Sequence, residues 1–186
     1  MIPLIISHSG RQIGARIVWA MLLWARRTDM DPSTRRQLVQ KYKEGYQTVA
    51  EAVDGASDGE LDARPAPEKW SAREIVHHLA DSEMTSAIRL RLLLVEDRPA
   101  IKGYDEAEFA RKLYYDRPIA ASLDAFRAAR LTTAELLDRM TDAQWEREGT
   151  HTAHGRYAVE DWLRIYADHA HNHADQIRRA RASARH

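Results

Sequence analysis

Apolar residues recur at helical spacing along most of the chain. In the first clear segment, about residues 32–54, they fall three and four positions apart, as one buried face of a helix requires: Leu38, Tyr42, Tyr46, Val49 and Val53. Similar patterns predict three more long helices and a short one, over about 71–96, 105–114, 119–140 and 158–183. No segment shows the alternation that predicts a strand. The pattern therefore predicts an all-α fold, a four-helix bundle with one or two extra short helices.

Two features mark where the predicted helices begin. Pro32 suits the first turn of a helix, because its missing amide hydrogen would have no partner there. Ser71 and Glu74 have the spacing of a capping box, in which each side chain accepts a hydrogen bond from the backbone amide of the other residue. We therefore expect one helix to begin at about residue 32 and the next at about residue 71.

Glycine, proline and polar residues separate the helices. DGASDGELDARPAPEK ends the first helix, residues 97–103 form a predicted loop, and REGTHTAHGRY at 147–157 predicts a polar loop. TDAQW at 141–145 predicts a further capped turn. The connection between the second and third long helices is longer than the others. That length favours a crossover over simple up-down winding.

The first 29 residues differ from the rest of the chain. They carry an apolar run, Ile17–Ala25, which is too short to span a bilayer. Two arginines follow this run, where a signal peptide would have small residues for cleavage. We expect residues 1–29 to be a poorly ordered N-terminal extension and residues 30–186 to form the bundle domain.

Composition narrows the function classes. Lysine plus arginine equals aspartate plus glutamate, 28 each, so no global charge points to nucleic acid. The chain has no cysteine, which excludes disulfides, thiolate metal sites and a cysteine nucleophile. Any metal ion must therefore be held by histidine, aspartate or glutamate. We expect a cytoplasmic protein that binds a small molecule, with neither a nucleic acid nor a membrane as partner.

Three histidines fall within five residues of the last predicted helix. His169 and His173 are four residues apart, on or beside its apolar face, so their side chains are neighbours on adjacent turns. His171 is about 200° away around the helix and is expected to face outward, with no role in metal binding. The spacing leaves two interpretations of the pair open: ligands of one divalent ion, or hydrogen-bonded core histidines. The metalloprotease motif H-E-x-x-H is absent, because Ala170 follows His169.

Two imidazoles do not complete a metal site, so a third ligand has to come from another helix. His77 and His78 in EIVHHLADSE are the obvious source, but only one of them can point toward the last helix, because neighbouring residues differ by about 100°. Three neutral imidazoles leave a fourth position open, as in catalytic zinc sites. His151 and His154 are expected on the surface, where they could line the mouth of such a site.

Two blocks of the sequence are similar to a known family. KWSAREIVHHLADSEMTSAIRLRLLLVEDRPAIKGYDEAEFA and YADHAHNHADQI resemble the DinB-like superfamily, in particular its YfiT-like metal-dependent hydrolases, over roughly residues 33–182. The resemblance implies a four-helix bundle that binds one divalent metal ion of the zinc or nickel type. It also implies the three ligands, His78, His169 and His173, and so chooses between the two adjacent histidines. Because relatives are often dimers, a homodimer is expected.

Four further residues are candidates near the predicted ion. Asp81 and Glu83 would orient the ligating imidazoles or transfer protons, since such imidazoles donate their second N–H to an acceptor. Alternatively, both are helix-surface carboxylates that pair with arginines. Some close relatives in the family that the sequence resembles carry a further histidine where this chain has Glu83. Tyr104 and Asp105 match the family's Tyr-Asp-Glu stretch and would form one wall of a cavity; alternatively, Asp105 only caps the short helix.

The implied site supports more than one chemistry. An ion on three histidines can lower the pKa of a water molecule, which gives a hydrolase. It can equally stabilise the thiolate of a low-molecular-weight thiol, which gives a thiol S-transferase of detoxification. The wider superfamily resembles both, including bacillithiol- and mycothiol-dependent enzymes. A third interpretation is a non-catalytic, stress-related bundle that binds a metal or a ligand. The hydrolase is the leading interpretation.

Overall fold

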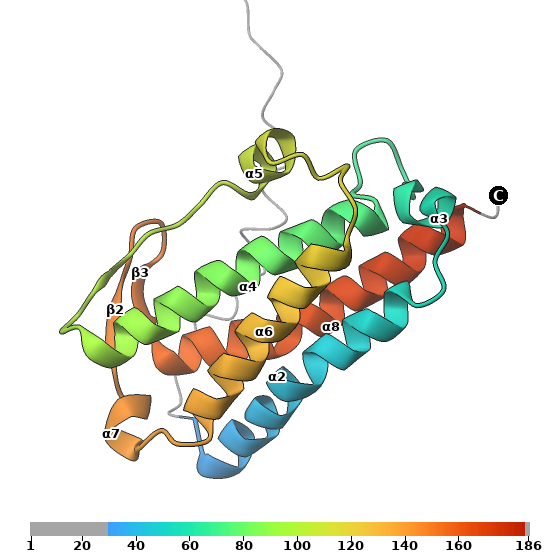
Figure 1. Cartoon of the computed structure of the whole chain (residues 1–186). Coiled ribbons are helices and arrows are strands. Elements are labelled where there is room, and N and C mark those ends of the chain that lie inside the picture. Colours follow the sequence, from blue (N-terminus) through green and yellow to red (C-terminus); the bar gives the residue numbers. More distant parts are fainter. Residues whose placement is uncertain (1–29, 185–186) are drawn as a thin grey trace, which may run out of the picture. The chain divides into compact units, whose positions relative to one another are not determined.

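Four long helices carry the fold of the computed structural model, which describes residues 30–184 (Figure 1). They are α2 (Pro32–Val53), α4 (Ala72–Val95), α6 (Ala120–Leu137) and α8 (Val159–Ser183). The four-helix bundle expected from the sequence is confirmed, and each end of a long helix lies within about three residues of its predicted position. The predicted extension at 1–29 lies outside the described residues.

The helix starts have the caps that the sequence predicts. The side chain of Ser71 accepts a hydrogen bond from the amide of Glu74 at 3.3 Å, and the carboxylate of Glu74 accepts one from the amide of Ser71 at 2.8 Å. α2 begins at Pro32. These local signals fix where two of the four long helices begin, and with them which residues face the core.

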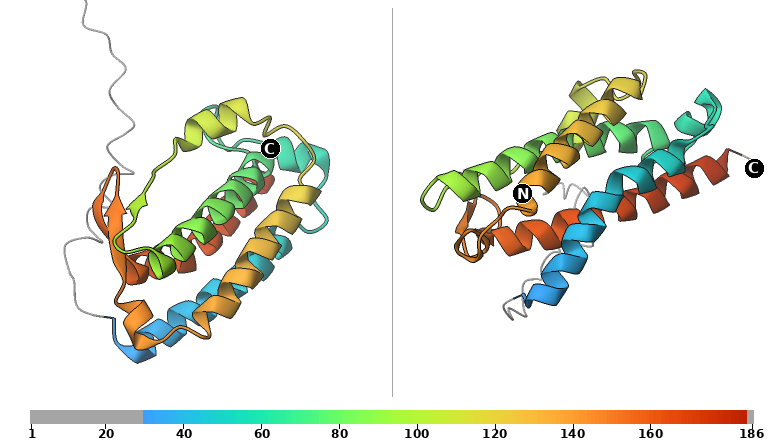
Figure 2. Two further views of the ribbon diagram at one scale, coloured as in Figure 1. Left: turned by 60° about the vertical axis from the view of Figure 1, so that its left-hand side comes forward. Right: turned by 60° about the horizontal axis from the view of Figure 1, so that its bottom comes forward.

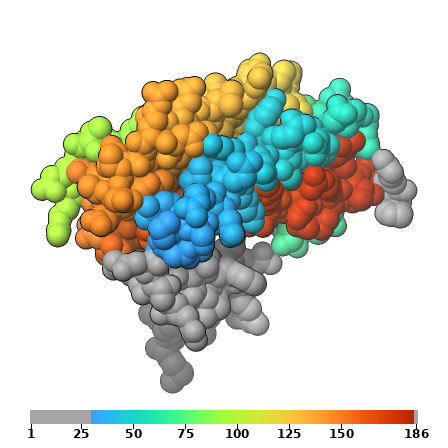
Figure 3. All heavy atoms as spheres, turned by 90° about the horizontal axis from the view of Figure 1, so that it is seen from below, coloured from blue at the N-terminus to red at the C-terminus, as the bar shows by residue number. Residues whose placement is uncertain are grey.

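The first and last long helices run side by side in the same direction. Lys41 pairs with Asp168 at 2.5 Å, and further along both helices Arg181 donates to the carbonyl oxygen of Ala52 at 2.6 Å. On the face shown in Figure 3, α2 lies between α6 and α8.

α4 and α6 also run parallel to each other, and opposite to α2 and α8 (Figure 2). His77 Nδ1 lies 2.7 Å from Ser122 Oγ near the start of both helices, and Glu83 pairs with Arg130 at 2.7 Å further along. Residues 96–119 therefore return the chain to the end of the bundle at which α4 begins. The expected crossover is confirmed.

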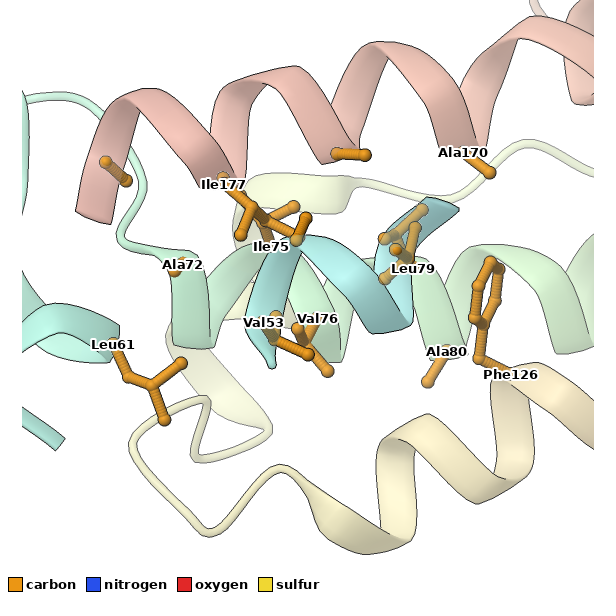
Figure 4. Close-up of a cluster of buried hydrophobic side chains, with 14 residues drawn as sticks. Val53, Leu61, Ala72, Ile75, Val76, Leu79, Ala80, Phe126, Ala170 and Ile177 are labelled. Carbon is orange, nitrogen blue, oxygen red and sulfur yellow. The ribbon is translucent and has the colours of Figure 1, made fainter. Parts of the chain in front are cut away.

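All four long helices contribute to one apolar core (Figure 4). Its larger side chains are less than a tenth exposed and include Val53, Ile75, Leu79, Phe126 and Ile177. α8 contributes mainly alanines at this surface, among them Ala170 and Ala174. Small side chains allow the neighbouring helices to approach α8 closely, which brings larger side chains on α4 within reach of those on α8.

Three short strands lie at one end of the bundle, where the sequence predicted only loops. β1 (Ala100–Ile101) pairs in parallel with β2 (Glu148–His151), which pairs in antiparallel fashion with β3 (Gly155–Ala158). The prediction of loops over 97–103 and 147–157 is therefore wrong. Strands of two to four residues are too short to show a period of two, and β1 and β2 are far apart in the sequence.

Three short helices complete the described part of the chain: α3 (Asp58–Asp62), α5 (Glu106–Lys112) and α7 (Asp142–Trp145). The sequence predicted α5 and the turn at α7. It missed α3, although Ser57 and Glu60 form a capping box there. Within residues 30–184, no helix combines the length and the apolar character that a membrane span needs.

Candidate metal centre

Three histidines from two antiparallel helices meet inside the bundle. His78 comes from α4, and His169 and His173 come from adjacent turns of α8. Nε2 of His78 lies 3.3 Å from Nε2 of His169, and one ring nitrogen of each histidine lies within 4.8 Å of the other two. His78 and His173 are buried, and His169 is half-buried. The structure thus brings together the three residues that were predicted as ligands.

The spacing and the chemistry of these nitrogens fit a divalent metal ion. Zinc binds histidine nitrogens at about 2.0–2.1 Å with tetrahedral geometry, which places two ligand nitrogens about 3.3 Å apart. The separation between His78 and His169 is 3.3 Å. The donors are all imidazoles, which suit zinc and nickel, whereas magnesium and calcium prefer oxygen. That the three residues bind a metal stays a prediction.

A neighbouring amide orients one of the predicted ligands. Nδ1 of His173 lies 3.1 Å from Oε1 of Gln176. An amide oxygen only accepts hydrogen bonds, so this ring nitrogen carries the proton and Nε2 is the nitrogen that has a lone pair. Gln176 was not among the site residues predicted from the sequence. Its position three residues after a candidate ligand, on the same face of the helix, is the signal that could have identified it.

Two aromatic rings flank the other two histidines. Trp70, just before α4, packs against His78 with 4.8 Å between ring centroids. Tyr166 of α8 lies edge-on to His169 with 5.7 Å between ring centroids. Because both rings are large and packed, they limit the rotamers that the two imidazoles can adopt.

His77, adjacent to His78, has a different role. It is fully buried, its Nε2 donates to the carbonyl oxygen of Arg117 at 2.9 Å, and its Nδ1 therefore accepts from the hydroxyl of Ser122 at 2.7 Å. Burial lowers the pKa of His77, which favours the neutral ring that this arrangement needs. His77 thus joins α4 to the end of the crossover, while His78 turns toward α8.

His171 lies apart from the three clustered histidines, as predicted, but it does not simply face solvent. Its ring is half-buried, and Nε2 donates to the carbonyl oxygen of Lys41 at 2.9 Å. The reason is that α2 runs alongside this flank of α8, an arrangement that the periodicity of α8 alone cannot reveal. His171 therefore connects two helices.

His151 and His154 were both expected on the surface, and the prediction is wrong for His151. His151 is a residue of β2 and is 7% exposed. His154 is exposed, and its ring stacks on that of His151 with 4.7 Å between ring centroids. Nδ1 of His151 accepts a hydrogen bond from the amide of Ala153 at 3.2 Å. Burial, with a smaller effect from the positive charge of Arg89, lowers the pKa of His151 to about 4.

A hydrogen bond to Asp81 connects the crossover segment, residues 96–119, to α4. Its side chain is half-buried, and Oδ2 accepts a hydrogen bond from the hydroxyl of Tyr115 at 2.7 Å. Burial and this carboxylate both raise the pKa of Tyr115. Asp81 lies one turn from His78 along α4, and a role in orienting the imidazoles or in proton transfer stays a prediction.

Glu83 is not on the surface, and both of its carboxylate oxygens accept hydrogen bonds from other helices; a role in orienting the imidazoles or in proton transfer stays a prediction. It is 0% exposed, its Oε2 accepts from Arg130 Nη1 at 2.7 Å, and its Oε1 accepts from the hydroxyl of Tyr42. Burial, followed by the charge of Glu83, raises the pKa of Tyr42 well above its usual value. The pairing with an arginine was one of the two sequence interpretations, but its place on the surface is wrong. These contacts join α4 to α6 and α2.

Tyr104 and Asp105 separate into two roles. The ring of Tyr104 packs against Phe109 at 4.6 Å, and the guanidinium of Arg89 lies 5.7 Å from its centroid. Burial raises the pKa of Tyr104. Asp105 is exposed and accepts a hydrogen bond from the amide of Glu108 at 3.0 Å, which caps α5. The capping interpretation of Asp105 is therefore confirmed, and Tyr104 as a cavity wall stays a prediction.

Comparison with known proteins adds to this geometry. A model of the DinB superfamily matches residues 41–177. The solved structure of YfiT from Bacillus subtilis, described as a "probable metal-dependent hydrolase with an unusual four-helix bundle topology", is 30% identical. It superposes with a TM-score of 0.77 and covers 82% of this chain and 88% of that chain.

Curated relatives carry similar names. "Putative metal-dependent hydrolase YfiT" of Bacillus subtilis is 31% identical over 153 residues, which are 81% of this chain and 86% of that protein. A protein of Oceanobacillus iheyensis, also named a "putative metal-dependent hydrolase", is 37% identical over 108 residues, 58% of this chain. The chain spans 63% of the length of this second relative, and 65% of a third from Halalkalibacterium halodurans.

Proposed function

The chain belongs to the DinB superfamily, and from this premise we propose that it is a hydrolase that acts through one divalent ion, zinc or nickel, held by His78, His169 and His173. The observation that carries the proposal is the cluster itself, in which three ring nitrogens from two helices lie within 4.8 Å of one another. The names of the relatives support the same reaction class. The substrate is proposed to be a small molecule.

The chemistry follows from the donor set. With one position left open by three neutral imidazoles, a bound divalent ion would lower the pKa of water and so supply a nucleophile near neutral pH. The chain's own residues hold the ligands for this purpose. Gln176 accepts the proton of His173 Nδ1, and the rings of Trp70 and Tyr166 limit how His78 and His169 can turn.

The metal site is tested by replacing each ligand with alanine. His78→Ala, His169→Ala and His173→Ala should each lose most of the bound metal, since two imidazoles hold a divalent ion far more weakly than three. Metal content is measured by elemental analysis after dialysis against buffered zinc or nickel. His171→Ala is the matched control, because it removes a histidine from the same helix and should leave the metal content unchanged. Equal metal content in all four variants would show that the site is elsewhere.

The reaction class is tested with the metal-loaded protein. A panel of esters and amides should be hydrolysed without any added thiol, and a chelator should abolish the rate because the ion would activate the attacking water. The same panel and a model electrophile are then assayed with low-molecular-weight thiols. Turnover that requires a thiol would replace the hydrolase with a thiol S-transferase. Metal binding without turnover in either assay would indicate a non-catalytic binding protein.

A further inference from the structure

Arg89 of α4 has only neutral partners within residues 30–184. Its Nη1 donates to the hydroxyl of Tyr166 at 3.3 Å, and its Nη2 donates to the carbonyl oxygen of Lys102 at 2.8 Å. Its Nε is buried and donates to no described group. A guanidinium has five N–H groups, and within residues 30–184 two protein acceptors are found for them, the hydroxyl of Tyr166 and the carbonyl oxygen of Lys102. The buried Nε–H has no acceptor among the described groups, which costs free energy that an incoming acceptor would recover.

Arg89 lies one aromatic ring away from the candidate metal centre. It follows His78 by eleven residues, close to three helical turns, so both side chains leave the same face of α4. The ring of Tyr166, whose hydroxyl accepts from Arg89, packs edge-on against His169. The guanidinium therefore lies further along the face of α4 that carries His78.

None of the described groups in contact with the guanidinium carries a negative charge. The aromatic ring of Tyr104 lies against the guanidinium. The hydroxyl of Tyr166 and the backbone carbonyl oxygen of Lys102, both neutral, accept hydrogen bonds from it. The charge of Arg89 is strong enough here to help lower the pKa of His151. A single positive charge among neutral partners matches an anion of a single negative charge.

We propose that Arg89 binds a carboxylate group of the substrate, so that the bond to be cleaved lies at the three clustered histidines. A guanidinium presents its N–H groups as a planar fork, the shape that accepts both oxygens of a carboxylate. The inference rests on the proposed hydrolase and deepens it. The protein would act on small esters or amides that carry a free carboxylate, and would discriminate against the neutral analogues.

The test uses ligands that cannot be hydrolysed, so that binding is measured apart from turnover. They are levulinate and its one- and two-carbon longer homologues, each a methyl ketone that ends in a carboxylate. Each is paired with the ketone in which a methyl group replaces the carboxylate. Calorimetric titration of the metal-loaded full-length protein should show at least one acid that binds about tenfold to a hundredfold more tightly than its neutral partner.

Two substitutions at Arg89 separate charge from shape. Arg89→Met should abolish the preference for the acid, and Arg89→Lys should retain only part of it, because lysine keeps the charge without the fork. Both should keep the wild-type metal content, which also reports that they fold. The control is Arg91→Met, which removes an arginine of the same helix that donates to Thr132 and Thr133 of α6 and should keep the full preference.

The inference fails if the wild-type protein shows no preference for the acids, or if Arg89→Met preserves it. Competition by inorganic phosphate that is tighter than binding of any acid would overturn the assignment of a carboxylate. Failure of the proposed hydrolase gives a different result: the protein would lack metal or ester hydrolysis, and the preference for the acids could still be measured.

Discussion

Arg130 lies where three other helices approach α6, and it is only 2% exposed. It pairs with Glu83 of α4 and donates to the backbone carbonyl oxygens of Tyr42 in α2 and Tyr166 in α8. Its guanidinium also lies 3.9 Å from the centroid of the Tyr42 ring. Removal of one partner from a buried ion pair costs about 3–5 kcal/mol, because the remaining charge stays buried. Arg130 therefore holds the helix that carries His169 and His173 at a defined distance from α2 and α4.

Gly45 of α2 makes room for this guanidinium. A Cβ atom there would lie 2.6 Å from Nη2 of Arg130 and 2.7 Å from Cβ of Ala170. In an open helix position, alanine is more stable than glycine by up to about 1 kcal/mol. At Gly45 the clash outweighs this gain, so we expect Gly45→Ala to lower the free energy of unfolding by about 1–3 kcal/mol. Urea denaturation of the two proteins measures the difference.

Gly59 provides the matched control. It lies in the helix α3, and a Cβ atom there would meet nothing within 4 Å. We expect Gly59→Ala to be neutral or to stabilise the protein by about 0.4–1 kcal/mol, because alanine restricts the unfolded chain. Similar unfolding energies for the two variants would contradict the close packing around Arg130.

At the residue scale, helical spacing predicted neighbours on one helix better than partners between helices. The pairing of His169 with His173 follows from their separation of four residues. The burial of Glu83 does not follow from any local pattern, because its partners Tyr42 and Arg130 are 41 and 47 residues away. The choice of His78 over His77 as a ligand needed the family resemblance. Both residues are buried, and the sequence does not show which neighbouring helix each side chain meets.

The hairpin of β2 and β3 is the element that local sequence patterns predict least well. It replaces a predicted polar loop, and its four-residue strands contain glycine, threonine and charged side chains. What holds it is pairing with a distant segment: the amide of Thr150 donates to the carbonyl oxygen of Pro99, and that of Thr152 to Ile101, both at 2.9 Å. The long helices, by contrast, are predicted by local periodicity and by their capping residues.

His151 makes this hairpin sensitive to acid. Its pKa is lowered to about 4 in the folded protein, against about 6.5 in an unfolded chain. Between these values the unfolded chain binds a proton that the folded protein excludes, so the free energy of unfolding falls as the pH is lowered from about 6.5 to about 4. We expect His151→Gln to have a shallower loss of stability over this range, measured by thermal denaturation at a series of pH values.

The comparison depends on slopes, because the substitution also changes stability at neutral pH. His154→Gln serves as the control, since it alters an exposed histidine of the same hairpin. Its slope should lie closer to that of the wild-type protein than the slope of His151→Gln does, because the charge of His154 is the smallest of the three causes that lower the pKa of His151. Parallel stability curves for the wild-type protein and His151→Gln would mean that His151 titrates in the folded state as it does in the unfolded chain.

For the whole molecule, the length of one connection predicted how the second and third long helices are joined. The long segment between α4 and α6 indicated a crossover, and residues 96–119 do return the chain so that α6 runs parallel to α4. The side-by-side pairing of α2 with α8 was beyond sequence reasoning, because periodicity shows which face of a helix is apolar but not which helix covers it. That pairing explains why His171 bonds to Lys41.

The contact between His78 and His169 has a consequence for the stability of the chain as a whole. These residues are 91 positions apart, in a chain with no cysteine to join its segments covalently. An ion bound between them would act as a reversible cross-link that closes a long loop in the folded chain only. Its binding energy would then add to the unfolding energy, and the melting temperature would follow the free metal concentration. Metal supply would thereby govern the lifetime of the protein as well as its activity.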